Sequence, residues 1–144
     1  MAIQQGLTNS FKQEMLQAGQ NLATDSLKMA LYTAFSDIGP LTTAYTATNE
    51  VTGTGYTAGG VVMTGVTTNT ESSGVDSGTV YVDFNNVSWP GASFTARGAL
   101  IYNVTQSNKS VAVLDFGSDK IFSSVSNTVV MPENTATTAL IRFP

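Results

Sequence analysis

A glycine-rich stretch is the part of the sequence that most resembles a ligand-binding loop. Residues 49–62, NEVTGTGYTAGGVV, contain Gly53, Gly55, Gly59 and Gly60. A phosphate-binding loop follows a strand and opens a helix, because the amides at the helix N-terminus bind the anion. Here the preceding segment is polar, the following VVMTGVT is typical of a strand, and no basic residue lies between positions 28 and 97. The sequence therefore argues against a nucleotide site, and the glycines are expected to form a turn or to allow close backbone approach.

Acid–base or metal chemistry would have to come from carboxylates, because the chain contains neither histidine nor cysteine. Their absence removes the commonest general base, every Ser-His or Cys-His pair, thiolate metal sites and disulfides. A glycosidase needs two carboxyl groups that face each other across a cleft. Most of the 10 acidic residues lie in expected turns or on outward positions, where a solvated charge is typical. We predict that the protein is not an enzyme and uses no cofactor.

The sequence DFGSDK at residues 115–120 carries two misleading patterns. Its first three letters match the metal-binding triplet of kinases, yet no glycine-rich loop, strand lysine or catalytic loop accompanies them. Asp115 and Asp119 are spaced faintly like a calcium loop, but the further acids and the terminal glutamate of that motif are absent. We expect a turn after a strand here, and a structural calcium ion stays an open alternative.

Charge is scarce in this sequence and does not favour a polyanionic partner. Charged residues make up 11% of the 144 residues, and the net charge is −4. The basic residues are scattered and do not form the stripe that binds nucleic-acid phosphates. No apolar run approaches the length of a membrane span, and the N-terminus shows no signal-peptide pattern. We expect no nucleic acid and no membrane as partner, and a hydroxyl-rich surface that other proteins can cover.

One amphipathic helix is predicted near the start of the chain, over residues 9–18. Ser10 and Gln13 fit a capping box, in which a hydroxyl and a glutamine three residues later satisfy free amides. Gly19 is expected to end or fray the helix. A helix this short is unstable alone, so its apolar stripe must dock on a sheet or on a neighbouring subunit. The stripe consists of Phe11, Met15, Ala18 and Leu22.

The rest of the chain alternates between strand and turn patterns. In residues 26–33, Leu27, Met29 and Leu31 fall on one face, as the period of a strand requires. The segment 79–89 alternates in the same way. Its inward set is Val80, Val82 and Phe84, and its outward set is Tyr81, Asp83 and Asn85. Further strands are expected over 61–67, 93–104, 111–117, 127–132 and 137–144, with QSNKS linking the second and third of these as a hairpin.

Seven or eight short strands separated by turns predict a mainly β protein. We expect an antiparallel β-sandwich or jelly-roll-like single domain with one short N-terminal amphipathic helix. The domain spans 1–144, with an N-terminal arm and helix over 1–25 and a sandwich body over 26–144. The polar stretch 34–60 and the turn-rich stretch 69–78 are expected to be loops.

Five segments, in this order, carry a family resemblance over nearly the whole chain: LTNSFKQEMLQAG, LKMALYT, NEVTGTGYTAGG, VDFNNVSWPGASFTARGALIYN and VAVLDFGSDK. They resemble a group of small virion proteins of tailed bacteriophages. The blocks at 49–60 and 89–102 carry most of the resemblance. No catalytic residues come with it.

The resemblance implies a non-enzymatic structural component of the virion. The role it favours is a decoration (cement) protein, which binds the capsid exterior and stabilises the shell. The partners would be the major capsid protein and further copies of the chain, with a trimer as the leading expectation. The protein would be made in the cytoplasm of the bacterial host and reside on the virion. A tail, neck or fibre-attachment protein is the near alternative.

Nine residues are candidates for the contact with these partners. The helix residues Phe11 and Met15 would pack either within the chain or on the capsid. Tyr45 and Tyr56 flank the threonine-rich loop and could anchor it within or between chains, and the four glycines would shape the loop around Tyr56. Trp89 is expected in the core, with an interface anchor as the alternative. The nine are Phe11, Met15, Tyr45, Gly53, Gly55, Tyr56, Gly59, Gly60 and Trp89.

Two further alternatives depend on how particular side chains are placed. A carbohydrate-binding jelly roll for host attachment would need exposed aromatic rings, and Tyr45, Tyr56 and Trp89 are the available platform. Arg97 lies in an apolar strand, TARGALIYN. It could pair with an inward carboxylate such as Asp115, but an exposed position on the strand is expected.

Overall fold

The computed structural model describes residues 2–123, 125, 127–133 and 135–144, and it confirms a mainly β, antiparallel fold with one short helix. The strands form a five-stranded sheet in the order β1-β8-β7-β2-β3, a three-stranded sheet β10-β5-β4 and a two-stranded sheet β6-β9. In chain order the elements are β1 (Gly6–Leu7), α1 (Asn9–Leu16), β2 (Leu27–Tyr32), β3 (Val61–Val62), β4 (Thr67–Thr70), β5 (Val80–Asp83), β6 (Val87–Ser88), β7 (Phe94–Asn103), β8 (Lys109–Phe122), β9 (Thr128–Val129) and β10 (Ile141–Phe143).

The hairpin of β7 and β8 forms the centre of the largest sheet. The two strands pair from Asn103 opposite Lys109 at the turn to Phe94 opposite Phe122 at the far end. The turn itself uses Asn108, which adopts the left-handed backbone at φ 60°, a conformation that asparagine tolerates better than most residues. The hairpin around QSNKS is confirmed.

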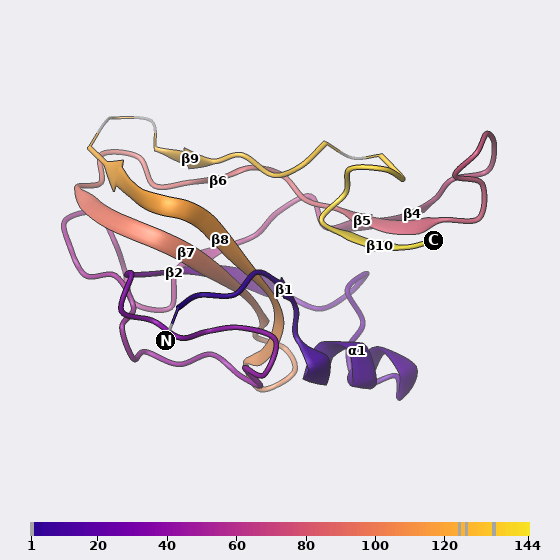
Figure 1. The fold of residues 1–144 in the computed structure, drawn as a ribbon, viewed down its shortest axis with the longest axis horizontal. Coiled ribbons are helices and arrows are strands. Elements are labelled where there is room, and N and C mark those ends of the chain that lie inside the picture. Colours follow the sequence, from indigo (N-terminus) through magenta and orange to yellow (C-terminus); the bar gives the residue numbers. More distant parts are fainter. Residues whose placement is uncertain (1, 124, 126, 134) are drawn as a thin grey trace.

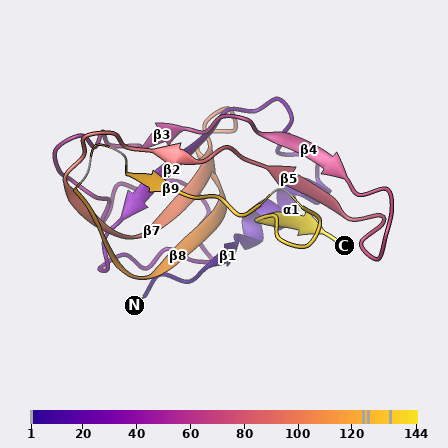
Figure 2. The same ribbon diagram turned by 90° about the horizontal axis from the view of Figure 1, so that it is seen from above.

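The sheets are arranged in two unequal layers, in a sandwich-like manner. Figures 1 and 2 show β6 and β9 crossing one face of the five-stranded sheet, while β4, β5 and β10 extend to one end. The main core lies between these layers. Leu27, Met29 and Leu31 point into it from β2, as their alternation predicts, and Trp89 and Met131 enter it from the opposite layer.

The other face of the five-stranded sheet is covered as well. Ala30 and Tyr32, which alternate with the first set on β2, belong to a second and smaller apolar cluster. The N-terminal arm supplies Ile3 to this cluster and the 34–49 segment supplies Ile38. Gly98 makes room for the arm, because a Cβ atom on it would lie 2.8 Å from Cδ1 of Ile3. The arm is thus packed into the body of the protein.

The helix differs from the prediction in its cap and its end. Oγ1 of Thr8 accepts a hydrogen bond from the N–H of Phe11 at 3.3 Å, so Thr8 is the N-cap in place of Ser10. The helix ends at Leu16, and Ala18 adopts φ 55° where the following glycine was expected to turn the chain. Among the described residues, no helix is long and apolar enough to cross a membrane.

Several predicted strands are shorter or divided. The segment 79–89 splits into β5 and β6, and Val80, expected to point inward, is 40% exposed. Of the segment 61–67, Val61–Val62 form β3 and Thr67 begins β4, while residues 63–66 lie outside the strands. β4 extends into the predicted loop 69–78, because it pairs with β5 in a separate sheet. Only two residues of the predicted strand 127–132 pair, as β9.

The expected turn at 115–120 is wrong, because these residues continue β8. Gly98 pairs with Asp115 and Ala96 pairs with Lys120, so four residues of β8 bulge out opposite a single residue of β7. Gly117 provides the left-handed backbone of this bulge at φ 77°. A bulge of this kind bends a strand and changes the direction of its side chains.

Candidate functional site

The loop that contains the predicted site residues is organised around a buried carboxylate. Glu50 is 9% exposed. Its Oε2 accepts a hydrogen bond from the Tyr45 hydroxyl at 2.6 Å. Its Oε1 accepts from the Tyr56 hydroxyl at 2.6 Å and from the N–H of Gly59 at 2.7 Å. We call these four residues the Glu50 cluster.

The backbone around Glu50 is held against the end of β2. Glu50 forms an isolated bridge with Tyr32, and the N–H of Val51 donates to the carbonyl of Leu31 at 2.9 Å. The N–H of Leu31 in turn donates to the hydroxyl of Tyr56 at 2.9 Å. The Glu50 cluster is therefore bonded directly to a central strand of the five-stranded sheet.

The charge of Glu50 is stabilised by hydrogen-bond donors. The described part of the chain has two ion pairs, Arg97 with Asp115 and Lys109 with Glu14, and neither involves Glu50. Burial raises the pKa of Tyr56 and of Tyr45 well above the usual value, and the hydrogen bond to Glu50 raises both further. The tyrosines are neutral donors over the physiological range, as a buried carboxylate requires.

The four predicted glycines are needed where backbones meet. A Cβ atom on Gly60 would lie 1.8 Å from the carbonyl oxygen of Met29, and one on Gly53 would lie 2.7 Å from that of Ser93. Gly55 and Gly59 adopt the left-handed backbone at φ 78° and 92°. These glycines therefore let the loop cross β2 and the start of β7 closely.

The aromatic candidates pack inside this chain. Trp89 is 2% exposed and stacks near Tyr56, with ring centroids 6.4 Å apart. Tyr45 stacks on Tyr102 at 4.8 Å. The expected core position of Trp89 is confirmed, although its indole N–H has no hydrogen-bond partner among the described residues. Tyr45, Tyr56 and Trp89 do not form the exposed platform that a carbohydrate site requires.

The helix candidates also pack within the chain. Phe11 is fully buried in the main core, and Met15 lies half-buried against it. Ala18, expected on the same stripe, is exposed because the helix has already ended. Of the two predicted roles for the stripe, intramolecular packing is the one that the geometry supports.

Arg97 differs from its expected position. Its Nε lies 3.3 Å from Oδ1 of Asp115, and both side chains are about one-third exposed, at 34% and 29%. The carboxylate also accepts the N–H of Gly117 at 2.9 Å. The ion pair therefore joins Arg97, the single β7 residue opposite the bulge, to Asp115, the β8 residue that precedes the bulge.

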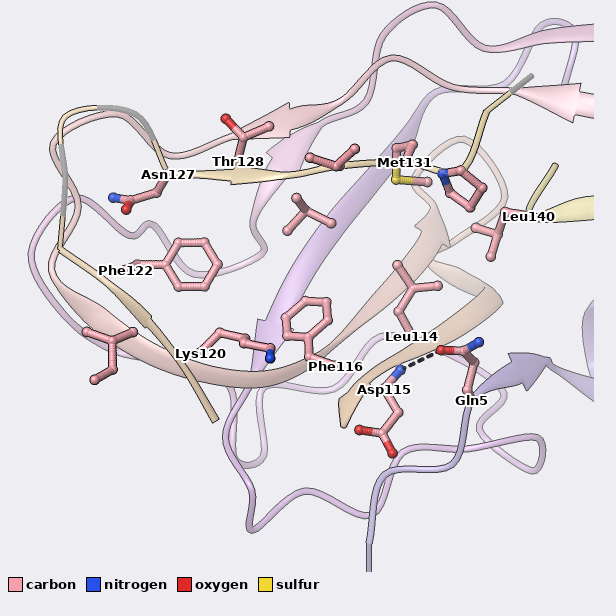
Figure 3. A pocket seen from close by; sticks show the side chains of 14 residues that line it. Gln5, Leu114, Asp115, Phe116, Lys120, Phe122, Asn127, Thr128, Met131 and Leu140 are labelled. Carbon is pink, nitrogen blue, oxygen red and sulfur yellow. Dashed lines mark hydrogen bonds between the residues drawn. The ribbon is translucent and has the colours of Figure 1, made fainter. Parts of the chain in front are cut away.

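A groove that the sequence did not indicate runs between β8 and the segment 127–132. It has a volume of about 570 Å³. Figure 3 shows Leu114, Phe116 and Phe122 on the β8 side and Met131 on the opposite side. Thr128 and Val129 of this segment pair with β6 and not with β8. Strand periodicity alone therefore could not locate the groove between the segment and β8.

Large apolar side chains also protrude elsewhere from the described surface. Phe35 is 84% exposed and Leu41 is 83% exposed, both in the segment that follows β2. No group of three or more acidic side chains in the described part of the chain is placed to hold a metal ion. The geometry therefore offers contact surfaces and a groove.

Comparisons of the chain with protein-family models, with curated proteins and with solved structures give no match.

Proposed function

We propose that the protein is a non-enzymatic structural component of a phage virion, bound to the capsid exterior as a decoration protein that stabilises the shell. The observation that carries the proposal is a loop fixed to the body along its length, from which Phe35 and Leu41 project into solvent. A fixed loop with exposed large apolar side chains is suited to contact another protein, because little ordering entropy is lost on binding.

The loop that carries Phe35 and Leu41 spans residues 33–50. Hydrogen bonds hold it at both ends and in the middle. The N–H of Thr33 donates to the carbonyl of Asn49 at 3.0 Å, and that of Tyr45 donates to the carbonyl of Asn108 at 2.9 Å. Pro40 accepts from the N–H of Asn9 at 2.8 Å. The Glu50 cluster closes the loop against β2. Phe35 and Leu41 are therefore displayed from a preorganised scaffold.

The scarcity of charge supports the same proposal. Interface cores are depleted in charged residues, and only 11% of this chain is charged. The resemblance to small tailed-phage virion proteins is the reason for proposing a virion as the location. It is also the reason for proposing the major capsid protein and further copies of the chain as the partners. A tail, neck or fibre-attachment position is the alternative within the virion.

The proposal is tested on particles of the encoding phage. Cryo-electron microscopy of particles with and without the protein should locate it on the capsid exterior, and particles that lack it should lose their DNA at a lower temperature. The double variant Phe35→Ser/Leu41→Ser should bind such particles more weakly. Val75→Ser is the matched control, because Val75 is fully exposed in the turn between β4 and β5.

The outcomes separate the parts of the proposal. Density on the tail would exclude the decoration role and leave a virion component. Absence of the protein from purified particles would refute both. Equal binding of the double variant and Val75→Ser would show that Phe35 and Leu41 do not form the contact. Native mass spectrometry of the free protein tests the expected trimer.

A further inference from the structure

The edge of β8 that faces the groove is without a strand partner for most of its length. β1 pairs with β8 only at Ala112 and Val113. Beyond Val113 the N-terminal arm leaves this edge, because the N–H of Gln4 donates to the carbonyl of Ile38 at 3.0 Å. From Leu114 to the end of β8, no described strand continues the pairing on this side. Such an edge is a template for an incoming strand, and the bulge at 116–119 divides it into one part at Leu114 and Asp115 and a second part at residues 120–122.

The first free amide on this edge is satisfied by a side chain. The N–H of Asp115 donates to Oε1 of Gln5 at 3.1 Å, as Figure 3 shows. In a continuous sheet a backbone carbonyl of the adjacent strand would occupy this position. The Gln5 amide thus marks where the carbonyl of a further strand would bind.

The walls of the groove are apolar, and apolar groups continue to its rim. Leu114, Phe116 and Phe122 line it from β8. Ile121 and Val130, which also line it, are 77% and 74% exposed. Apolar side chains of an extended segment could pack here while its backbone pairs with β8.

The groove contains one basic side chain that has no acidic partner in the described part of the chain. Lys120 lines the groove, and its Nζ contacts only the hydroxyl of Ser118, at 2.9 Å, among the described residues. The one acidic lining residue, Asp115, is already paired with Arg97. A protein of net charge −4 therefore presents an unpaired ammonium group at this site.

We propose that the groove binds an extended strand of a partner protein, which adds to the free edge of β8 and carries alternating apolar side chains and a carboxylate that reaches Lys120. Backbone pairing would provide affinity, and the apolar walls and Lys120 would provide specificity, as in other cases of strand addition. This inference rests on the proposed function in one respect only, namely that the partner protein belongs to the same virion.

A synthetic peptide tests the groove without particles. The probe has roughly eight residues, an ordinary strand length, alternates valine with threonine and carries one central aspartate. Fluorescence anisotropy should show saturable binding, and hydrogen exchange should show protection confined to amides in residues 114–122. A peptide with lysine in place of aspartate, and one of the same composition with its valines in one block, should both bind more weakly.

Charge reversal provides the matched pair of variants. Lys120→Glu should weaken binding of the aspartate peptide by roughly fivefold to tenfold, since an exposed ion pair contributes up to a factor of about five and the reversal adds repulsion. Lys12→Glu makes the same charge change on the exposed face of α1, outside the groove, and should leave the affinity unchanged.

Three results would overturn the inference: no binding of the aspartate peptide, equal binding of the block peptide, or equal weakening by Lys120→Glu and Lys12→Glu. These results do not depend on the location of the protein in a virion. Peptide binding by a protein that is absent from particles would retain the groove and reject the proposed function. Particle binding without peptide binding would do the reverse.

Discussion

The hydroxyl of Tyr56 donates to Oε1 of Glu50 at 2.6 Å while it accepts the N–H of Leu31 at 2.9 Å. One phenol thereby links the buried carboxylate to the backbone of β2. Because Gly59 donates to the same carboxylate oxygen, the glycine-rich loop and the sheet share one polar centre. The loop that looked suited to bind a phosphate instead places one of its amides on an internal anion.

Removing the carboxylate of Glu50 should destabilise the fold. Glu50→Ala leaves two hydroxyls and one N–H without their acceptor, and we expect a loss of about 3 kcal/mol or more in the free energy of unfolding. Glu50→Gln should lose only about 1 kcal/mol, since its oxygen can replace Oε1 and the Tyr45 hydroxyl can turn to accept from its NH₂ group. Urea denaturation measures both. Glu133→Ala, at an exposed position, is the control, and equal losses for it and Glu50→Ala would refute the role of the cluster.

Alkaline pH should destabilise the protein through its buried tyrosines. Burial, followed by the nearby Glu50 charge, raises the pKa of Tyr32 and Tyr102, and Tyr45 and Tyr56 are raised as well. Since the folded-state pKa exceeds the unfolded value of about 10, the stabilisation is complete below pH 10 and is lost as pH rises toward the folded-state pKa. Tyrosinate absorbance should rise together with the loss of circular dichroism. Ionisation of these four tyrosines near pH 10 in a folded protein would contradict this.

A methyl group at position 60 should be far more damaging than one at position 74. Both glycines have left-handed backbones, at φ 77° and 79°. The Cβ of Gly60→Ala would lie 1.8 Å from the Met29 carbonyl oxygen, whereas that of Gly74→Ala meets nothing within 4 Å. We expect Gly60→Ala to prevent folding and Gly74→Ala to cost about 1–2 kcal/mol from backbone strain alone. The yield of soluble protein and the free energy of unfolding in urea measure the two effects. Similar values for the two variants would disprove the close approach of Gly60 to the Met29 carbonyl.

The helix cap can be checked with two hydroxyl deletions. Thr8→Ala removes the N-cap acceptor and also the acceptor of the Ser110 hydroxyl, and should lower the free energy of unfolding by about 2 kcal/mol or more. Thr8→Ser keeps the hydroxyl and should retain most of that stability. Ser10→Ala, at the position that the capping-box pattern indicates, should cost less than Thr8→Ala. The reverse order in thermal or urea unfolding would restore Ser10 as the cap.

Strand alternation predicted the parts of the fold whose faces are set by local pattern. β2 and the hairpin of β7 and β8 were identified correctly, because their apolar residues alternate or run continuously between clear turns. The sequence did not indicate the bulge at 116–119, because Asp115 and Gly117 are typical turn residues and predict the end of the strand. Only the pairing of both flanks with β7 keeps them in the strand.

The candidate site was located in part. The sequence indicated the tyrosines and glycines of the site. It did not indicate Glu50, because a glutamate in a polar stretch is normally solvated. The available signal was its position five residues after Tyr45 and six before Tyr56. The groove gave no local signal, because the segment 127–132 is held by its pairing with β6, which the periodicity of either segment does not reveal. The ion pair of Arg97 depends on the register of β7 and β8, which brings Asp115 beside it and which the sequence does not fix.

The pairing of β1 with β8 has a consequence for how the chain folds during synthesis. The Thr8 N–H and hydroxyl both contact the carbonyl of Val111, 103 residues further along the chain. On the ribosome the first strand therefore stays without its partner until most of the polypeptide has emerged, and closing so long a loop is slow. During that interval Ile3 and the part of β7 at Gly98 that it contacts in the folded protein are both exposed. Newly made chains should therefore be prone to aggregate until the N-terminal arm has docked, unless they are dilute or bound by chaperones.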